Sequence, residues 1–427
     1  MSGEVPLLAA YTQIFMPALG KFLTKYFPLF LLGALFGKLM AESGCAQSIA
    51  NQISATLGSH HAILAVVLCV AVLTYGGVSL FVVAFAIYPM ANSVFQTANI
   101  PRRLIPGTIA LGSGTFTMTS LPGTMQIQNL IPMAYFKTTA FAAPILGIIG
   151  GLCTFVLGML WLKRRANIAA QNSEGYATAA GSGPGENRRT APDLDCPTPP
   201  FSFAMALIGG VLICNFIFAE YWIPSWNTGY LSEPKFSGVT VADVRGIWSS
   251  VMALLVACGV LIVCSSRCRQ RLSEILKVGA LESLLPVFNT ASEVGYGATI
   301  AALPAFTVIK NALLSIVPSN PLISEAAAIS VLAGITGSAS GGLSIALESL
   351  GATYYNRALE FGVSPEVMHR VASMASGGLD SLPHNGAVIT LLTICGLTHK
   401  QSYFDIGVVT VIIPLIALAL VIALASF

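Results

Sequence analysis

Three ionisable side chains inside otherwise apolar segments are the first candidates for chemistry in this sequence. Asp380 and His384 stand on either side of a proline, and with an unwound backbone between them they can share or relay a proton near neutral pH. Glu293 lies in the Gly-rich stretch 290–295, which we interpret as another break. An ionisable group in hydrocarbon costs about 2.5 to 3.5 kcal/mol, so each is a proton-coupling candidate. The structural alternative is that Asp380 caps a half-helix and His384 bonds a carbonyl.

Small and hydroxyl-bearing residues gather in four polar interruptions of apolar segments. Glycines let the backbone approach a ligand, and hydroxyl and amide groups offer neutral hydrogen bonds. The N-terminus of a half-helix at such a break carries a partial charge of about +0.5. This positive charge favours a bound carboxylate. The structural alternative is that the small residues only allow close helix packing. The predicted substrate-binding residues are Gly76, Gly77, Ser79, Ser120, Gly123, Thr124, Ser340, Gly341, Gly342, Ser344, Ser381 and Asn385.

Membrane-embedded helices are needed to position these residues. Of the 427 residues, 55% are hydrophobic and only 9% are charged, and the mean hydropathy is +0.77. Soluble domains are about a quarter charged. Since a span needs about 20 apolar residues, the chain holds roughly eight to eleven embedded segments. We therefore predict an all-α, multi-pass protein of the cytoplasmic (inner) membrane, and the N-terminus does not have the pattern of a secretory signal.

A polar segment divides the chain into two transmembrane halves. Residues 163–200 are rich in Gly, Ser, Asn and Pro and predict a flexible cytoplasmic linker between residues 1–162 and 201–427. The second half opens with two plain spans, 201–222 and 246–264, which have no counterpart in the first half. We therefore expect the first half to lack two initial spans.

The two halves share an internal repeat. The Gly-Gly-x-Ser pattern of residues 76–79 recurs at 341–344, and the Ser-Leu-Pro pattern of 120–122 recurs at 381–383. Paired breaks at corresponding places are typical of secondary transporters with inverted repeats. Irregular backbone at membrane depth persists only where protein or a water-filled cavity surrounds it. Each half is therefore expected to hold one re-entrant hairpin and one broken transmembrane helix around a central cavity.

The distribution of basic residues supports this inverted topology. With re-entrant hairpins, the loop 225–243 falls outside, and most clusters of Lys and Arg fall on the cytoplasmic side, as the positive-inside rule requires. Arg357 and Arg370 fall on the outer side and are the main exceptions. The clusters assigned to the cytoplasmic side are Arg102 with Arg103, residues 163–165, residues 267–277, and His399 with Lys400.

Other functional classes find little support. A net charge of +3 without a basic stripe argues against nucleic acid as a partner. The cysteines lie mostly singly in apolar runs, so neither a metal site nor another cofactor is predicted. An intramembrane serine hydrolase is a distant alternative, since Ser340-Gly341 precedes His384, but residue 338 is Ser where a Gly-x-Ser-Gly pattern needs Gly. A channel is also disfavoured, because no selectivity filter or Arg series is present.

Two segments carry a resemblance to a known family. Residues 27–38 (FPLFLLGALFGK), residues 376–386 (SGGLDSLPHNG) and the two broken hairpins resemble the GntP-type gluconate permease family of the ion-transporter superfamily. The resemblance implies proton symport of gluconate or a related sugar or hydroxy acid. Sodium coupling, and a short-chain substrate such as 3-hydroxybutyrate or a citrate-like acid, stay open as alternatives. The expected partners are a small organic anion, the lipid bilayer and, as an alternative to a monomer, a second copy in a homodimer.

Overall fold

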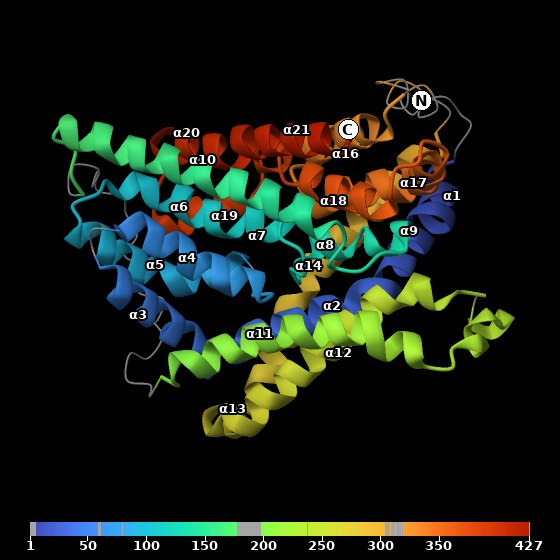
Figure 1. Ribbon diagram of the computed structural model, residues 1–427, viewed down its shortest axis with the longest axis horizontal. Coiled ribbons are helices and arrows are strands. Elements are labelled where there is room, and N and C mark those ends of the chain that lie inside the picture. Colours follow the sequence, from blue (N-terminus) through green and yellow to red (C-terminus); the bar gives the residue numbers. More distant parts are fainter. Residues whose placement is uncertain are drawn as a thin grey trace.

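The computed structural model describes most of the chain as a bundle of helices (Figure 1). The described residues are 6–58, 61–78, 80–176, 198–236, 238–303, 308, 312, 317 and 319–426, and none of these forms a β-strand. Within these ranges five helical stretches are long and apolar enough to cross a membrane, namely Leu7–Glu42, Pro144–Gln171, Phe201–Ser225, Val241–Cys264 and His399–Ala425.

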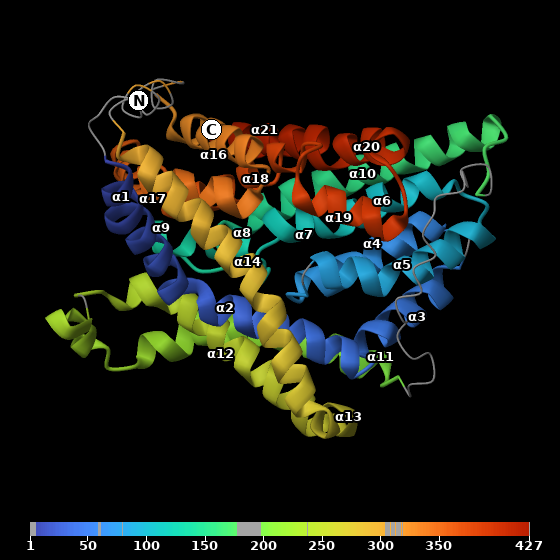
Figure 2. The ribbon, with the colours of Figure 1, turned by 180° about the vertical axis from the view of Figure 1, so that it is seen from behind.

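The long helices form two outer layers. Helices α10 (Pro144–Gln171), α20 (His399–Gly407) and α21 (Ile413–Ala425) lie along one side, and α2 (Met16–Glu42), α11 (Phe201–Ile217) and α12 (Val241–Cys264) lie along the opposite side (Figures 1 and 2). Their outward faces expose large apolar side chains, as lipid-facing helices do. Examples are Ile145, Leu152, Leu160, Ile213, Leu255, Val263 and Ile416.

Two helical hairpins lie between these layers. The first joins α4 (Ala62–Tyr75) to α5 (Leu80–Thr97), and the second joins α16 (Pro321–Thr336) to α17 (Ala339–Glu360). Helices α4 and α16 have only 14 and 16 residues, fewer than the about 20 that a full span needs. The second hairpin is closely packed, since a Cβ on Gly342 would lie 2.2 Å from the backbone nitrogen of Ala333.

Each hairpin is followed by a helix that is interrupted midway. In the first half, α7 (Phe116–Thr119) gives way to irregular backbone before α8 (Ile127–Leu130). In the second half, α18 (Pro365–Ser376) ends before a short turn at Leu379–Ser381, and α19 (Gly386–Cys395) follows. These irregular segments lie at the predicted breaks 120–124 and 380–385. The same regions also contain α6 (Ile105–Ser113) and α9 (Met133–Phe136).

Helix α14 (Leu272–Ala301) corrects one prediction. The chain was expected to break around Glu293, but α14 continues through Pro286 and the Gly-rich stretch as one helix. Its glycines serve close packing instead: a Cβ on Gly279 would lie 2.7 Å from the Leu35 side chain of α2, and one on Gly297 would lie 2.6 Å from Ile345 of α17. As a result α14 can cross α2 closely, which Figure 2 shows.

The predicted linker and repeat also differ in detail from the structure. Helix α10 runs on to Gln171, well inside the predicted linker 163–200, and the Tyr176 hydroxyl donates to Asn92 of α5. Residues 177–197 lie outside the described residues. In the repeat, Gly76 and Gly77 form the turn of the first hairpin, whereas the second hairpin turns at Gly337-Ser338, so Gly341 and Gly342 already belong to α17.

The remaining elements are short or connect the larger ones. Helices α1 (Leu7–Ala9) and α3 (Cys45–Leu57) lie near the two ends of α2, and α13 (Ser266–Gln270) leads into α14. The other elements are 3₁₀ or π-helical turns. They are Ala10–Phe15, Arg102–Leu104, Phe218–Trp222, Ile223–Ser225, Gly229–Ser232, Pro234–Phe236 and Val408–Ile412.

A buried ion-pair cluster joins α20 of the second half to α10 and to the turn at residues 102–104. The Asp405 side chain is only 2% exposed, and its oxygens accept from Arg103 at 2.9 Å, Arg165 at 2.7 Å and the Trp161 indole at 3.1 Å. Arg103 also binds Glu174 at 2.6 Å, and this hydrogen bond keeps the pKa of the Glu174 carboxyl below its ordinary value. The cluster therefore fixes the ends of α10 and α20 against residues 102–104.

We expect Asp405→Asn to destabilise the protein strongly. The substitution leaves Arg103 and Arg165 close together without their shared carboxylate, and breaking a buried pair costs about 3 to 5 kcal/mol. Denaturant unfolding in detergent measures this loss. The matched control is Glu233→Gln, which removes an exposed pair with Lys235 (49% and 65% exposed) and should cost no more than about 1 kcal/mol. Equal stabilities of the two variants would contradict the prediction.

Candidate functional site

The tip of the first hairpin contacts the first break. The Tyr75 hydroxyl donates to the carbonyl of Pro122 at 2.6 Å, and the Gln126 side chain donates to the carbonyls of Thr74 at 2.7 Å and Val78 at 3.3 Å. Gly77 has a φ of +101°, a conformation that side chains disfavour. These bonds join side chains and backbone carbonyls of the hairpin tip to those of the first break.

The first break folds back on itself through buried polar groups. Gly123 has a φ of +81° and donates its backbone N–H to Ala140 at 2.8 Å. The Thr124 hydroxyl donates to the carbonyl of Thr117 at 2.7 Å, and the Asn129 amide donates to Thr124 at 3.0 Å and to Ala140 at 2.9 Å. Asn129 thus holds the break, although the sequence reasoning did not single it out.

The tip of the second hairpin contacts the second break in the same way. The Asn385 side-chain amide donates to the carbonyls of Gly337 and Asp380, both at 2.9 Å, and its oxygen accepts from the backbone N–H of Val388 at 2.9 Å. Asn385 is therefore the N-cap of α19. Ser338 is the N-cap of α17 and accepts from Gly341. As a result the N-terminal ends of α17 and α19 meet at one place.

Glu293 of α14 lies at this hairpin tip. Its Oε2 accepts from the Ser338 hydroxyl at 3.2 Å, and the Ser340 hydroxyl lies 3.4 Å from that of Ser338 and 3.2 Å from that of Thr290. A Cβ on Gly341 would lie 2.1 Å from Oε2 of Glu293, so only glycine leaves room for the carboxylate. The N-terminus of α17 thus faces a carboxyl group, a favourable arrangement for an ionised acid.

Asp380 and His384 share this region, but no hydrogen bond joins them among the described residues. Asp380 is buried and accepts from the Ser381 hydroxyl at 3.0 Å. His384 is exposed and packs beside Gly337, where a Cβ would lie 2.7 Å from its ring. Tyr403 donates to the carbonyl of Ser381 at 3.1 Å.

Arg370 of α18 joins the second half to residues beside the first break. It is fully buried, and its guanidinium donates to the carbonyl of Ala142 at 2.7 Å and of Thr119 at 3.4 Å, and to the Asn129 side-chain oxygen at 3.0 Å. Ser373, one turn on, also donates to Thr119 at 2.8 Å. Within the described ranges Arg370 has no acidic partner.

His369, beside Arg370, extends the same buried network. Its Nδ1 lies 2.6 Å from the Thr138 hydroxyl, and its Nε2 lies 3.2 Å from the Asn129 oxygen that also accepts from Arg370. Because the Asn129 oxygen can only accept, Nε2 carries a proton and donates to it. The guanidinium of Arg370 therefore lies in a network of buried hydrogen-bonding groups.

The sequence reasoning missed Arg370 because it placed that residue on the outer side as a charge against the topology. The structure places Arg370 within α18, where it is 0% exposed, so it belongs to the protein interior and is not a charge in a loop. The signal was a pair of charged or titratable residues, His369 and Arg370, in the segment that runs from 367 to 395. The same reasoning passed over Glu325, which lies fully buried in α16.

Some predicted residues lie away from these contacts. Gly76 packs on Ile208 of α11, and Gly342 packs on the Ala333 backbone. Ser344 is buried in α17 without a hydrogen-bond partner for its hydroxyl, and Ser79 lies outside the described residues. The backbone carbonyl of Ser120 packs against α10, where a Cβ on Gly147 would lie 2.4 Å from it.

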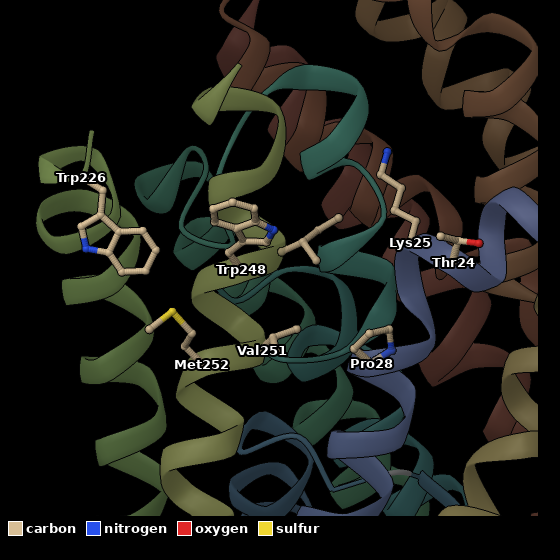
Figure 3. Close-up of a pocket in the computed structure, with 8 residues that line it drawn as sticks. Thr24, Lys25, Pro28, Trp226, Trp248, Val251 and Met252 are labelled. Atoms are coloured by element: carbon tan, nitrogen blue, oxygen red, sulfur yellow. The ribbon is translucent and has the colours of Figure 1, made fainter. Parts of the chain in front are cut away.

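A separate cavity of about 430 Å³ opens between α2 and α12. Figure 3 shows Trp226 on one side of Trp248 and the α2 residues Thr24 and Lys25 on the other. The Lys25 ammonium lies 5.5 Å from the Tyr135 ring centre. None of the residues predicted from sequence lines this cavity.

Comparison with known proteins identifies the family. The profile of the GntP family permeases matches residues 9–426. The chain belongs to the GntP permease family. The uncharacterized transporter YxjC of Bacillus subtilis (strain 168) is 45% identical to this permease over 415 residues, which are 95% of the permease and 87% of YxjC.

A solved structure shares the fold of the permease. It is the crystal structure of the YdaH transporter of Alcanivorax borkumensis, a transporter of unusual topology. The TM-score is 0.52 and the sequence identity is 16%, and the match covers 98% of the permease and 88% of YdaH. Family and fold together make the permease a multi-pass membrane transporter rather than an enzyme. The predicted family and the all-helical transporter fold are therefore confirmed.

Proposed function

We propose that this permease is a proton symporter that carries gluconate or a related sugar or hydroxy acid across the cytoplasmic (inner) membrane. The observation that carries the proposal is Arg370, a fully buried cation without an acidic partner in the described ranges, at the contact between α18 and the first break. A buried charge is costly unless it is compensated. A carboxylate that arrives with the substrate supplies the missing negative charge.

The groups around Arg370 and the hairpin tips suit a hydroxylated acid. The N-termini of α17 and α19 meet at the second break, and helix N-termini favour anions. Hydroxyl groups of Ser340, Ser381 and Thr290 offer neutral hydrogen bonds to substrate hydroxyls. A short-chain acid such as 3-hydroxybutyrate or a citrate-like acid is the alternative substrate, because it presents a carboxylate to the same groups.

The proposed mechanism is alternating access by two inverted halves. We infer that the hairpins α4–α5 and α16–α17 are re-entrant, because α4 and α16 are too short to span a bilayer. Each hairpin tip is bonded to the break of its own half. Movement of a hairpin relative to its broken helix would then open the site to one side of the membrane.

We propose Asp380, His384 and Glu293 as candidates for proton coupling at the second hairpin tip. The positions of these residues support the proposal, because all three lie at the second break or against the hairpin tip that contacts it. Replacing Asp380 and His384 singly with Asn, and finding unchanged uptake driven by a pH gradient, would exclude this pair. Sodium is the alternative coupling ion, because hydroxyls and unwound carbonyls also bind it.

Uptake into proteoliposomes tests the proposal. With an inward gradient of one pH unit and no sodium, a symporter that moves one proton with one monoanion accumulates substrate about tenfold, since one unit is worth 1.36 kcal/mol. We expect this for labelled gluconate, with labelled 3-hydroxybutyrate assayed in parallel. A protonophore that collapses the gradient is the control. Accumulation of neither acid would refute the proposed substrates, and accumulation only with a sodium gradient would refute proton coupling.

A further inference from the structure

Glu325 is the most isolated ionisable group in the second hairpin. It lies in the second turn of α16 and is 0% exposed, and both of its carboxyl oxygens are buried without a hydrogen-bond partner among the described residues. The other buried acids differ from it. The Asp405 carboxylate accepts from Arg103, Arg165 and Trp161, and Asp380 accepts from the Ser381 hydroxyl. Glu293, which is half-buried, accepts from the Ser338 hydroxyl.

An ionised carboxylate in such surroundings is unfavourable by a wide margin. Moving an isolated ion into a medium of low dielectric constant costs tens of kcal/mol by idealised solvation estimates, and several kcal/mol per ion in real proteins. A neutral carboxylic acid without partners costs only about 1 to 3 kcal/mol. Glu325 therefore carries a proton in the described conformation.

The titratable and charged groups on the neighbouring helices leave Glu325 without a partner. On α17, the Tyr354 hydroxyl donates to the carbonyl of Ser324 at 3.2 Å, and the Arg357 guanidinium lies 5.8 Å from the Phe361 ring centre. On α18, His369 and Arg370 bond to groups of the first half, namely Asn129, Thr138, Ala142 and Thr119. In the turn after α18, Asp380 bonds to Ser381.

Helix α16 also connects Glu325 to the proposed substrate site. The Ser330 hydroxyl, further along α16, donates to the carbonyl of Ala375 in α18 at 2.9 Å. A Cβ on Gly334 would lie 3.1 Å from Leu379, at the second break. The helix that holds Glu325 thus lies directly against the helix that carries Arg370, and a movement between the two would change the surroundings of both residues.

We propose that Glu325 carries the coupled proton, an inference that rests on the proposed proton symport. While α16 packs on α17 and α18, the acid stays neutral. When the hairpin moves and water reaches Glu325, its O–H bond breaks, the electron pair stays on the carboxylate oxygen, and the proton passes to water on the open side. For net symport, Glu325 takes up its proton together with the substrate on the opposite side, because an ionised Glu325 cannot be buried without a partner. The empty permease then returns with Glu325 ionised and in contact with water.

Glu325→Gln separates coupling from binding. Glutamine has nearly the same shape and cannot release a proton, so we expect exchange of labelled for unlabelled gluconate without a gradient to stay within about twofold of wild type. Accumulation under one pH unit should fall from about tenfold to about one, the value without coupling. Glu282→Gln, at an exposed position of α14, is the matched control and should accumulate substrate like wild type.

Each other outcome of this experiment overturns the inference. Accumulation by Glu325→Gln equal to wild type would show that the proton travels elsewhere. Loss of exchange as well as accumulation would place Glu325 in substrate binding or in structure.

Thermal unfolding of the purified variants tests the protonation state separately. A neutral Glu325 predicts the same midpoint for wild type and Glu325→Gln, whereas a large drop for Glu325→Gln would mean an ionised, paired carboxylate and overturn the inference. This measurement stands even when no substrate is transported, so failure of the proposed symport and failure of the Glu325 assignment are distinguishable.

Discussion

Arg370→Gln is expected to abolish accumulation of the organic acid. The substitution removes the buried positive charge of the site and leaves the carbonyl of Ala142 without the guanidinium donors of Arg370. Each unsatisfied buried group costs about 1 to 3 kcal/mol, and a loss of 2.7 kcal/mol lowers binding about 100-fold. We therefore expect uptake of labelled gluconate to fall at least about 100-fold.

Two further variants separate charge from structure at this position. Arg370→Lys keeps the charge but lacks the planar fork that reaches both carbonyls and Asn129, so uptake should be intermediate. Arg164→Gln removes an exposed arginine near the end of α10 and should leave uptake unchanged. Size-exclusion profiles establish that each variant is folded. A folded Arg370→Gln protein that accumulates gluconate like wild type would refute the role of Arg370 in binding the anion.

Gly342→Ala is expected to disrupt the second hairpin. The added Cβ would lie 2.2 Å from the nitrogen and 2.3 Å from the Cα of Ala333. Both atoms belong to the backbone, so no change of rotamer relieves the overlap and α16 must move away from α17. Overpacking typically costs 1 to 3 kcal/mol, and we expect about 3 kcal/mol or more here because backbone is displaced.

Denaturant unfolding of matched glycine variants measures this effect. Gly33→Ala is the control, since a Cβ on Gly33 in α2 meets no atom within 4 Å, and alanine is favoured over glycine inside a helix by about 0.5 to 1 kcal/mol. The control should be as stable as wild type or slightly more stable. If Gly342→Ala matched the control, the two helices of the hairpin would not pack as closely as described.

The breaks can be predicted from the sequence because a group of polar residues inside an apolar segment is rarely compatible with an unbroken helix that faces lipid. Asn385, Ser340 and Glu293 belong to separate apolar segments, yet all three lie at or against the second hairpin tip. Membrane depth explains this result: the unpaired carbonyls of a break need donors, and side-chain amides and hydroxyls supply them. The paired breaks therefore locate the predicted site more reliably than any single residue does.

The features that could not be predicted from the sequence depend on how a helix is oriented toward its neighbours. Arg370 was assigned to the outer side because charge counting records only position along the chain, whereas its burial depends on contacts with the first half. Gly342 was predicted to bind substrate, but the turn of its hairpin falls earlier, so the glycine packs on Ala333. The absence of a partner for Glu325 could be recognised only once its neighbours were placed.

The crossing of α2 and α14 has a consequence for how the protein is made. Glu42 at the end of α2 pairs with Arg271, which lies 229 residues further along the chain. At a synthesis rate of about 5 to 20 residues per second, α2 enters the bilayer roughly 10 to 45 seconds before its partner exists. During that interval lipid or an insertion factor must cover the face that later meets α14. The pairing of α2 with α14 therefore takes place within the membrane, between segments that were inserted separately.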